Sequence, residues 1–315
     1  MSKYNVIKTR QLEMLETAFG KDVMWYLNDD KTIEVMLNPD GRLHYERVGE
    51  GKVATDIYIS AEQSENIVKL VAAYKNSVAS IVQPEVATEL PFDGARFQGW
   101  LPPIVERACF SIRRRAVAIY TLDQYVEQGV ITQSQKNILC DAVKSRKNII
   151  IVGGTSSGKT TFANALLDQL YGAPDRVLVL EDLPELQVRV DDLVTMTTSD
   201  SIKMRDLVRG SLRMRPDRII IGEIRDGAAL DLLKAWNTGH PGGLCTVHAN
   251  SAESTPYRLE DLIQEVVVTV PTNLIKQSLD LIAFIKKQKD GSRKVETIAS
   301  LTGYESGKYE FEYYT

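Results

Sequence analysis

One continuous run of the sequence, residues 153–160, has the residue types and the spacing needed to bind phosphate groups. It satisfies every fixed position of the pattern G-x-x-x-x-G-K-[ST], in which the glycines let the backbone curl and turn its N–H groups inward. The lysine of the pattern reaches the β- and γ-phosphates of a nucleotide, and the hydroxyl after it ligates Mg²⁺. We therefore predict a site for ATP with Mg²⁺. Its residues are Gly153, Gly154, Thr155, Ser156, Ser157, Gly158, Lys159 and Thr160.

The elements on either side of this run are those that a phosphate-binding loop requires. Residues 148–152 form an apolar stretch typical of a buried strand, and residues 161–171 carry apolar side chains at helical spacing. The N-terminus of the helix adds partial positive charge beside the phosphates. The alternative is a simple glycine turn between a strand and a helix. We disfavour it because the motif and its flanking elements are all present.

Two acidic residues follow predicted strands and are candidates for the chemistry of hydrolysis. Glu181 comes directly after the apolar run 177–180, and Glu223 follows the run 219–221 and one glycine. The carboxyl end of a strand projects into the crevice where ligands bind in open α/β sheets. One carboxylate could complete the Mg²⁺ shell while the other orients or deprotonates the attacking water. Taken singly, either acid could also be a solvated loop residue.

Histidine and arginine residues supply further candidates. His248 ends the predicted strand 244–247, as the two acids end theirs, whereas His240 lies before it and could equally be a packing residue. Arginines gather in residues 205–218 and again at 113–115. Charge runs usually form a solvated face, but phosphoryl transfer also needs cations near the γ-phosphate. The second run lies beside the expected linker between domains, so it could reach over a bound nucleotide.

Composition limits the class of protein. The chain has 315 residues, of which 43% are hydrophobic and 25% charged, which is typical of a soluble globular protein with two domains. The net charge of −4 argues against stable nucleic-acid binding. Three scattered cysteines, Cys109, Cys140 and Cys245, indicate free thiols in a reducing cytoplasm. No apolar run approaches the ~20 residues of a membrane span.

The pattern of apolar runs predicts an α/β fold in two domains. Residues 1–115 are expected to form a smaller N-terminal α+β domain, with a strand at 32–37, a turn at 38–41 and a capping box that starts a helix at Ser60. Residues 116–315 alternate between short apolar strands and helices, as in a sheet covered on both faces. The last 35 residues or so, punctuated by Asp-Gly and Ser-Gly, are expected to form antiparallel hairpins.

Four segments in this order resemble the secretion-type hexameric ATPases that drive type II and type IV secretion and pilus machines. Residues 212–226 resemble the atypical Walker B signature of that family, residues 180–185 its acidic box, and residues 239–250 its histidine box. Residues 94–97 and 101–113 resemble the nucleotide-capping region of the small domain. The resemblance implies a RecA-like P-loop NTPase core at 116–315, preceded by the smaller α+β domain.

The resemblance also implies roles for individual residues. Glu223 is the better candidate for water activation, with Glu181 close behind and near the Mg²⁺. His248 would contact the γ-phosphate, and Arg96 and Arg113 would approach the nucleotide from the N-terminal domain. The chain would assemble as a homo-hexamer in the cytoplasm, peripheral at the inner-membrane face, against inner-membrane components of the apparatus. A long N-terminal extension and a metal-binding cysteine cluster are missing from the sequence, which favours the conjugation branch of the family, active in pilus assembly, DNA transfer or both.

Two other functions compete with this one. A DNA-stimulated motor or recombination ATPase of RecA-like fold would show a DNA-stimulated rate with steep salt dependence. A nucleotide-gated scaffold without hydrolysis would release no phosphate, although the two acids argue against it.

Overall fold

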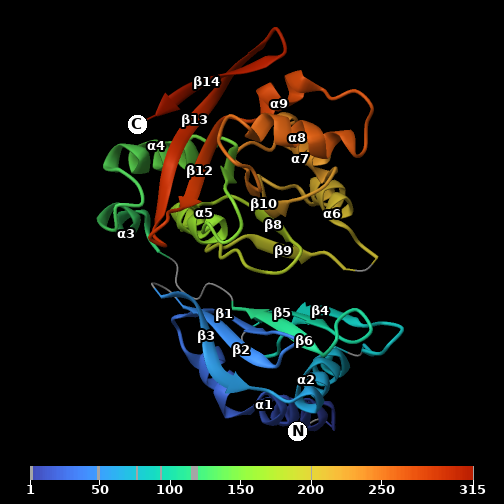
Figure 1. The fold of residues 1–315 in the computed structure, drawn as a ribbon. Coiled ribbons are helices and arrows are strands. Elements are labelled where there is room, and N and C mark those ends of the chain that lie inside the picture. Colours follow the sequence, from blue (N-terminus) through green and yellow to red (C-terminus); the bar gives the residue numbers. More distant parts are fainter. Residues whose placement is uncertain are drawn as a thin grey trace. The chain divides into compact units, whose positions relative to one another are not determined.

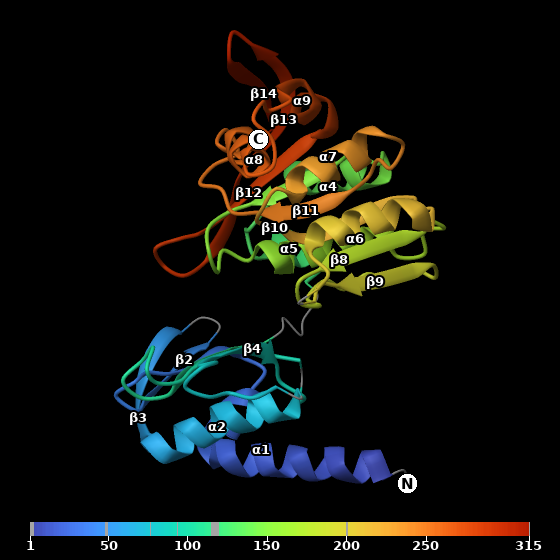
Figure 2. The ribbon, with the colours of Figure 1, turned by 90° about the vertical axis from the view of Figure 1, so that its right-hand side faces the viewer.

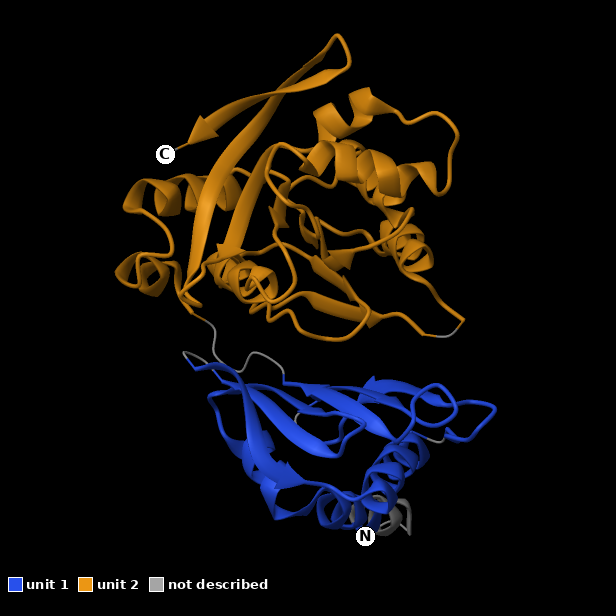
Figure 3. Ribbon diagram, viewed as in Figure 1, with its two compact units in different colours: residues 1–117 blue, residues 118–315 orange. Residues whose placement is uncertain are grey.

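The computed structural model describes residues 3–47, 50–75, 77–92, 94–114, 120–199 and 201–314. The chain divides into two compact units (Figures 1 and 3), which are residues 1–117 (unit 1) and 118–315 (unit 2). The domain boundary expected between residues 115 and 116 lies outside the described residues and stays a prediction.

Unit 1 consists of a six-stranded antiparallel sheet, in the order β3-β2-β1-β6-β5-β4, and two helices. The helices α1 (Lys3–Asn28) and α2 (Ala61–Tyr74) lie side by side (Figure 2), and α1 is kinked at Gly20. The hydroxyl of Ser60 accepts the N–H of Gln63 and starts α2, as the sequence predicts. The strands are β1 (Thr32–Leu37), β2 (Arg42–Arg47), β3 (Gly51–Tyr58), β4 (Glu85–Glu89), β5 (Arg96–Trp100) and β6 (Cys109–Arg113).

Unit 2 is built on an eight-stranded sheet in the order β14-β13-β12-β7-β11-β10-β8-β9. The strands from β12 to β9 pair in parallel, and β12, β13 and β14 form the antiparallel hairpins expected at the end of the chain. The strands are β7 (Ile149–Val152), β8 (Val177–Glu181), β9 (Leu193–Thr197), β10 (Arg218–Ile224), β11 (Leu244–Val247), β12 (Leu281–Lys287), β13 (Arg293–Glu305) and β14 (Lys308–Tyr314).

Helices cover both faces of this sheet, because its central strands are apolar on both sides. Ile150 and Val152 of β7 pack in the same core as helices α6 to α9, whereas Ile149 and Ile151 pack with α3 to α5. Figure 2 shows α6 and α7 running along the strands β8, β10 and β11. The helices are α3 (Leu122–Glu127), α4 (Gln133–Lys144), α5 (Lys159–Leu167), α6 (Met204–Ser211), α7 (Ala228–Asn237), α8 (Thr255–Gln264) and α9 (Thr272–Ser278), with 3₁₀ turns η1 (Asp168–Leu170) and η2 (Leu212–Met214).

The predicted fold class is confirmed: an α/β unit follows a smaller α+β unit. The predicted helix at 161–171 begins two residues earlier than expected and ends in the turn η1. Because β7, β11, β10 and β8 are parallel neighbours, their carboxyl ends meet at one edge of the sheet. The phosphate loop, His248, Glu223 and Glu181 all follow or end these strands. Among the described residues, no helix is long and apolar enough to cross a membrane.

Candidate active site

The loop between β7 and α5 has the conformation of an anion-binding loop. Gly158 has φ 94°, a left-handed backbone that favours glycine, and caps the N-terminus of α5. The Lys159 ammonium is buried and donates hydrogen bonds to the carbonyl oxygens of Gly153 and Gly154, both at 3.0 Å. The hydroxyl of Ser157 is also buried and has no hydrogen-bond partner within the described part of the chain. Buried polar groups gathered on such a loop fit a polyphosphate that would complete their hydrogen bonds.

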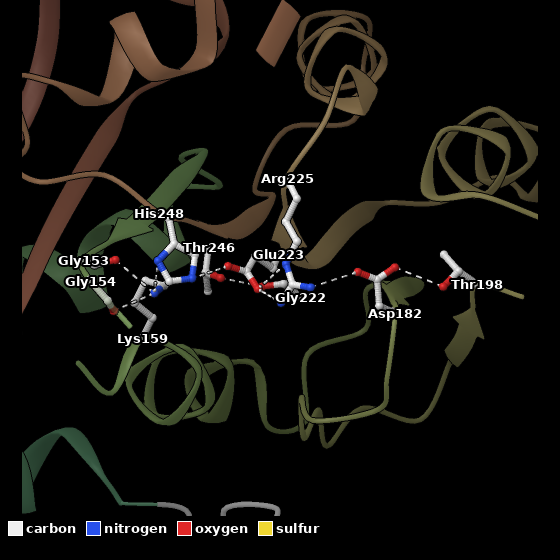
Figure 4. Close-up of polar contacts among 10 residues, drawn as sticks. All are labelled: Gly153, Gly154, Lys159, Asp182, Thr198, Gly222, Glu223, Arg225, Thr246 and His248. Atoms are coloured by element: carbon white, nitrogen blue, oxygen red, sulfur yellow. Dashed lines mark hydrogen bonds and ion pairs between the residues drawn. The ribbon is translucent and has the colours of Figure 1, made fainter. Parts of the chain in front are cut away.

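A row of polar contacts begins at this loop and crosses the edge of the sheet (Figure 4). The Lys159 Nζ lies 3.4 Å from Nδ1 of His248, which directly follows β11. The other ring nitrogen of His248, Nε2, lies 2.8 Å from Oε1 of Glu223 on β10. The structure therefore brings Lys159, His248 and Glu223 together, although they come from distant parts of the sequence.

The contacts of His248 indicate which of its ring nitrogens carries the proton. An ammonium has no acceptor, so Nδ1 of the ring must be the bare nitrogen that faces Lys159. A neutral imidazole then carries its proton on Nε2, beside the Glu223 carboxylate. Burial and the positive charge of Lys159 lower the pKa of His248, and Glu223 opposes this less strongly. His248 is thus a neutral link between the lysine of the loop and the acid.

This arrangement predicts an NMR titration with a defined sign. The pKa of His248 should lie below its ordinary value of 6.5. Lys159→Ala should raise this pKa because one depressing charge is removed, and Glu223→Gln should lower it further because the stabilising carboxylate is lost. The chain has three histidines, so His44 and His240 serve as internal references in the same spectra. An upward-shifted His248 in the wild-type protein would contradict the arrangement.

A β-bulge places the Glu223 side chain. Ile221 pairs with Cys245 and Ile224 pairs with Val247, so three steps along β10 match two along β11. Such a bulge re-aims a side chain next to a site. Gly222 lies in the bulge, where an added Cβ would approach Cγ of Glu181 to 3.0 Å.

The second acid of the site, Glu181, ends β8 and is only 3% exposed. Its Oε1 accepts the backbone N–H groups of Glu185 and Leu186, each at 2.8 Å. These bonds hold the loop after β8 against the carboxylate and stabilise its charged form. Glu181 is therefore more enclosed than Glu223, whose side chain is 18% exposed.

The row of contacts continues beyond Glu223 through residues that the sequence analysis did not single out. The Arg225 Nε donates to Oε2 of Glu223 at 2.8 Å, and a guanidinium Nη1 lies 3.9 Å from Asp182. Asp182 in turn accepts the hydroxyl of Thr198 at 3.0 Å (Figure 4). Arg225 lies one residue beyond the end of β10, so the alternation of side chains along a strand gave no signal for it.

The arginines predicted for the small domain lie opposite each other in unit 1. Arg96 on β5 pairs in register with Arg113 on β6. Glu89 faces Arg96 on one side of this pair, and Glu34 faces Arg113 on the other. Two like charges directly opposite each other repel, so the flanking acids and a bound anion would both stabilise the pair. Their approach to the nucleotide stays a prediction.

His240 lies at the amino ends of the strands, opposite the candidate site. It precedes β11, and its Nδ1 lies 2.9 Å from the carbonyl oxygen of Pro216, which precedes β10. This contact favours the interpretation of His240 as a packing residue.

The residues at the site fit ATP with Mg²⁺. Within the described ranges, no cluster of three or more His, Cys, Asp or Glu residues could hold a metal ion by itself. Mg²⁺ in nucleotide sites needs only one or two protein ligands, because phosphates and water supply the others. Thr160 and one strand-end carboxylate meet that requirement.

Comparisons with known proteins identify the family. Residues 96–299 match the family described as type II/IV secretion system protein (T2SSE). The chain is 44% identical over 305 residues to a probable conjugal transfer protein TrbB of Sinorhizobium fredii (strain NBRC 101917 / NGR234), covering 96% of this chain and 93% of that protein. It is 43% identical over 307 residues to a conjugal transfer protein TrbB of Rhizobium radiobacter, covering 97% and 94%.

A solved structure supports the fold. The ATPase DotB of Legionella pneumophila superposes with a TM-score of 0.63 at 18% identity, covering 96% of this chain and 82% of that one. This likeness confirms the RecA-like core with its smaller N-terminal unit. The family match and the TrbB relatives extend over most of the chain, and the phosphate loop and its acids lie inside the matched residues. The chain therefore belongs to the type II/IV secretion system ATPases.

Proposed function

We propose that the protein hydrolyses ATP in a Mg²⁺-dependent reaction that powers a type IV secretion or conjugative transfer apparatus. The observation that carries this proposal is the contact of the phosphate-loop lysine with Glu223 through His248. A loop that binds phosphates and an acid that activates water are thereby joined at one edge of the sheet. The names of the TrbB relatives support conjugal transfer as the process that is powered.

Each residue of the site has a part in this reaction. Lys159 binds the β- and γ-phosphates, and Thr160 ligates the metal. Bound Mg²⁺ neutralises charge on the phosphate oxygens. Glu223 orients the attacking water and accepts its proton, while His248 holds the carboxylate through Nε2 and lies close to the γ-phosphate.

The surroundings of the two acids, Glu223 and Glu181, indicate different roles in hydrolysis. Glu223 is partly exposed and contacts side chains that can move, so it can reach a water molecule. Glu181 is enclosed and has one oxygen occupied by two backbone N–H groups, so it suits a fixed place near the metal shell. We therefore assign water activation to Glu223 and metal support to Glu181.

The protein is proposed to act as a cytoplasmic homo-hexamer on the inner-membrane face, bound to membrane components of the apparatus. Arg96 and Arg113 would contact the nucleotide when unit 1 closes on it, which couples binding energy to motion. Light scattering should detect a hexamer that a non-hydrolysable ATP analogue and Mg²⁺ favour. A monomer at micromolar protein with saturating analogue would count against the ring.

The arginine pair provides a separate prediction. Arg113→Ala should slow hydrolysis about 100-fold, because a cation near the transferring phosphoryl group is lost, while nucleotide binding changes only a few-fold. The measurements are phosphate release and equilibrium nucleotide binding. Lys52→Ala removes an exposed cation from β3 of the same unit and should have no effect on either. Unchanged turnover in Arg113→Ala would remove the arginine from the mechanism without deciding the oligomeric state.

The biological role is tested in a strain that lacks the gene. Mating assays should be scored separately for pilus production and DNA transfer, with the wild-type gene restoring both and Lys159→Ala restoring neither. A purified protein whose hydrolysis is stimulated by DNA with a steep salt dependence would instead support a DNA motor.

A further inference from the structure

The hairpin of β12 and β13 packs directly against the phosphate loop at both of its fixed glycines. A Cβ at Gly153 would overlap the carbonyl oxygen of Ile285 on β12. A Cβ at Gly158 would lie 2.9 Å from Cδ and 3.1 Å from Nε of Arg293, the first residue of β13. The loop can take glycine alone at these positions without moving the hairpin. The hairpin is thus a wall of the phosphate site.

This wall lies on the side of the loop away from the catalytic residues. The end of β7 pairs with β11 on one side, through Val152 and Val247, and with β12 on the other, through Val152 and Phe284. His248 and Glu223 belong to the β11 and β10 side. A nucleotide whose γ-phosphate faces Glu223 must extend its α-phosphate and nucleoside away from that side, toward the hairpin.

The guanidinium of Arg293 is a cation that the rest of the structure does not neutralise. Among the described residues, the guanidinium has neither a hydrogen-bond partner nor an ion-pair partner, and residue 293 as a whole is half-buried. The hydroxyl of Tyr125 lies close enough for the charge of Arg293 to lower its pKa, against the larger effect of burial, which raises it. A partly desolvated cation beside an anion-binding loop gains most when an anion supplies its missing hydrogen bonds.

We infer that Arg293 is a nucleotide-binding residue that contacts the α-phosphate, at the end of the nucleotide opposite Glu223. Its stem packs on Gly158 and positions the guanidinium beside the loop. Arg293 thereby adds a contact to the α-phosphate, whereas a single inorganic phosphate in the loop is bound by the loop and Lys159 without it. The inference rests on the nucleotide orientation of the proposed function.

Isothermal titration calorimetry with ADP and, separately, with inorganic phosphate tests this inference. Arg293→Met keeps a stem over Gly158 and removes the charge. It should weaken ADP binding about tenfold, the scale of one charge-assisted hydrogen bond, and leave the binding of inorganic phosphate unchanged. Arg293→Lys should recover part of the ADP affinity because it restores a cation. The apparent KM for ATP should rise by a larger factor than kcat falls.

Lys294→Ala is the matched control, since it removes the next cation of the same strand, whose side chain is exposed. It should bind both ligands as the wild type does. An Arg293→Met protein with wild-type ADP affinity would overturn the inference, and so would equal losses for ADP and inorganic phosphate, which indicate a disturbed loop. A Lys variant as weak as the Met variant would assign the contact to stacking on the base and overturn the phosphate contact. Failure of the wild type itself to bind ADP would be a failure of the proposed function.

Discussion

Lys159→Ala should reduce ATP hydrolysis about 1,000-fold or more, to the background of the assay. The ammonium is placed on the β- and γ-phosphates, where negative charge develops in the transition state, and no other cation of the loop replaces it. In the structure this group donates hydrogen bonds to two carbonyl oxygens of the loop and lies 3.4 Å from Nδ1 of His248, so it is held where the phosphates would bind. Phosphate release under saturating ATP and Mg²⁺ is the measurement.

The same substitution should leave the fold intact. The carbonyl groups of Gly153 and Gly154 can bond to water once the lysine is removed, so the melting temperature should change by no more than a few degrees. Lys144→Ala, an exposed lysine in the last turn of α4, is the control for loss of charge. Wild-type turnover in a folded Lys159→Ala protein would refute the assignment of the phosphate loop.

Glu223→Gln should slow turnover at least ~100-fold while ATP and Mg²⁺ still bind, because the size is kept and the general base is lost. Single-turnover hydrolysis and equilibrium binding separate these two effects. An amide cannot ionise, so the loss of activity should not be restored at higher pH. An active Glu223→Gln enzyme would reverse the assignments of the two acids.

Glu181→Gln provides the contrast. If Glu181 supports the metal, this variant should need more Mg²⁺ for half-maximal activity and should recover most of its turnover at high Mg²⁺. Glu223→Gln should gain nothing from added Mg²⁺. Glu305→Gln changes an exposed acid on β13 and serves as the control for both. Equal metal dependence in the two site variants would contradict the division of roles.

Local signals in the sequence predicted the elements that carry chemistry. The strand, loop and helix around Lys159 are adjacent in the chain, so one motif and the apolar runs beside it define them. The long helix α1 was not predicted, although Leu15, Phe19, Val23 and Leu27 recur at every fourth position and are buried. The strand β9 was also missed, because threonines interrupt its half-buried apolar residues and leave no continuous apolar run.

The sequence did not predict which strands lie side by side. The meeting of His248 with Glu223 depends on β11 lying beside β10, and on the bulge that turns Glu223 toward it. The contact of Arg293 with the loop depends on the pairing of β12 with β7, two strands separated by more than a hundred residues. Tertiary packing determines both, and neither spacing nor propensity reports them.

The bulge in β10 divides the strand into two parts that are aligned separately. The buried part, Arg218–Ile221, pairs with β8 and, at Ile220 and Ile221, with β11, whereas the end of the strand, at Ile224, pairs with β11 in a register shifted by one residue. Removal of one residue at the bulge would leave the buried part in place and turn every later side chain over, so that Glu223 would exchange faces with its neighbour. The length of this strand between Ile221 and Ile224 should therefore be the same in homologous chains.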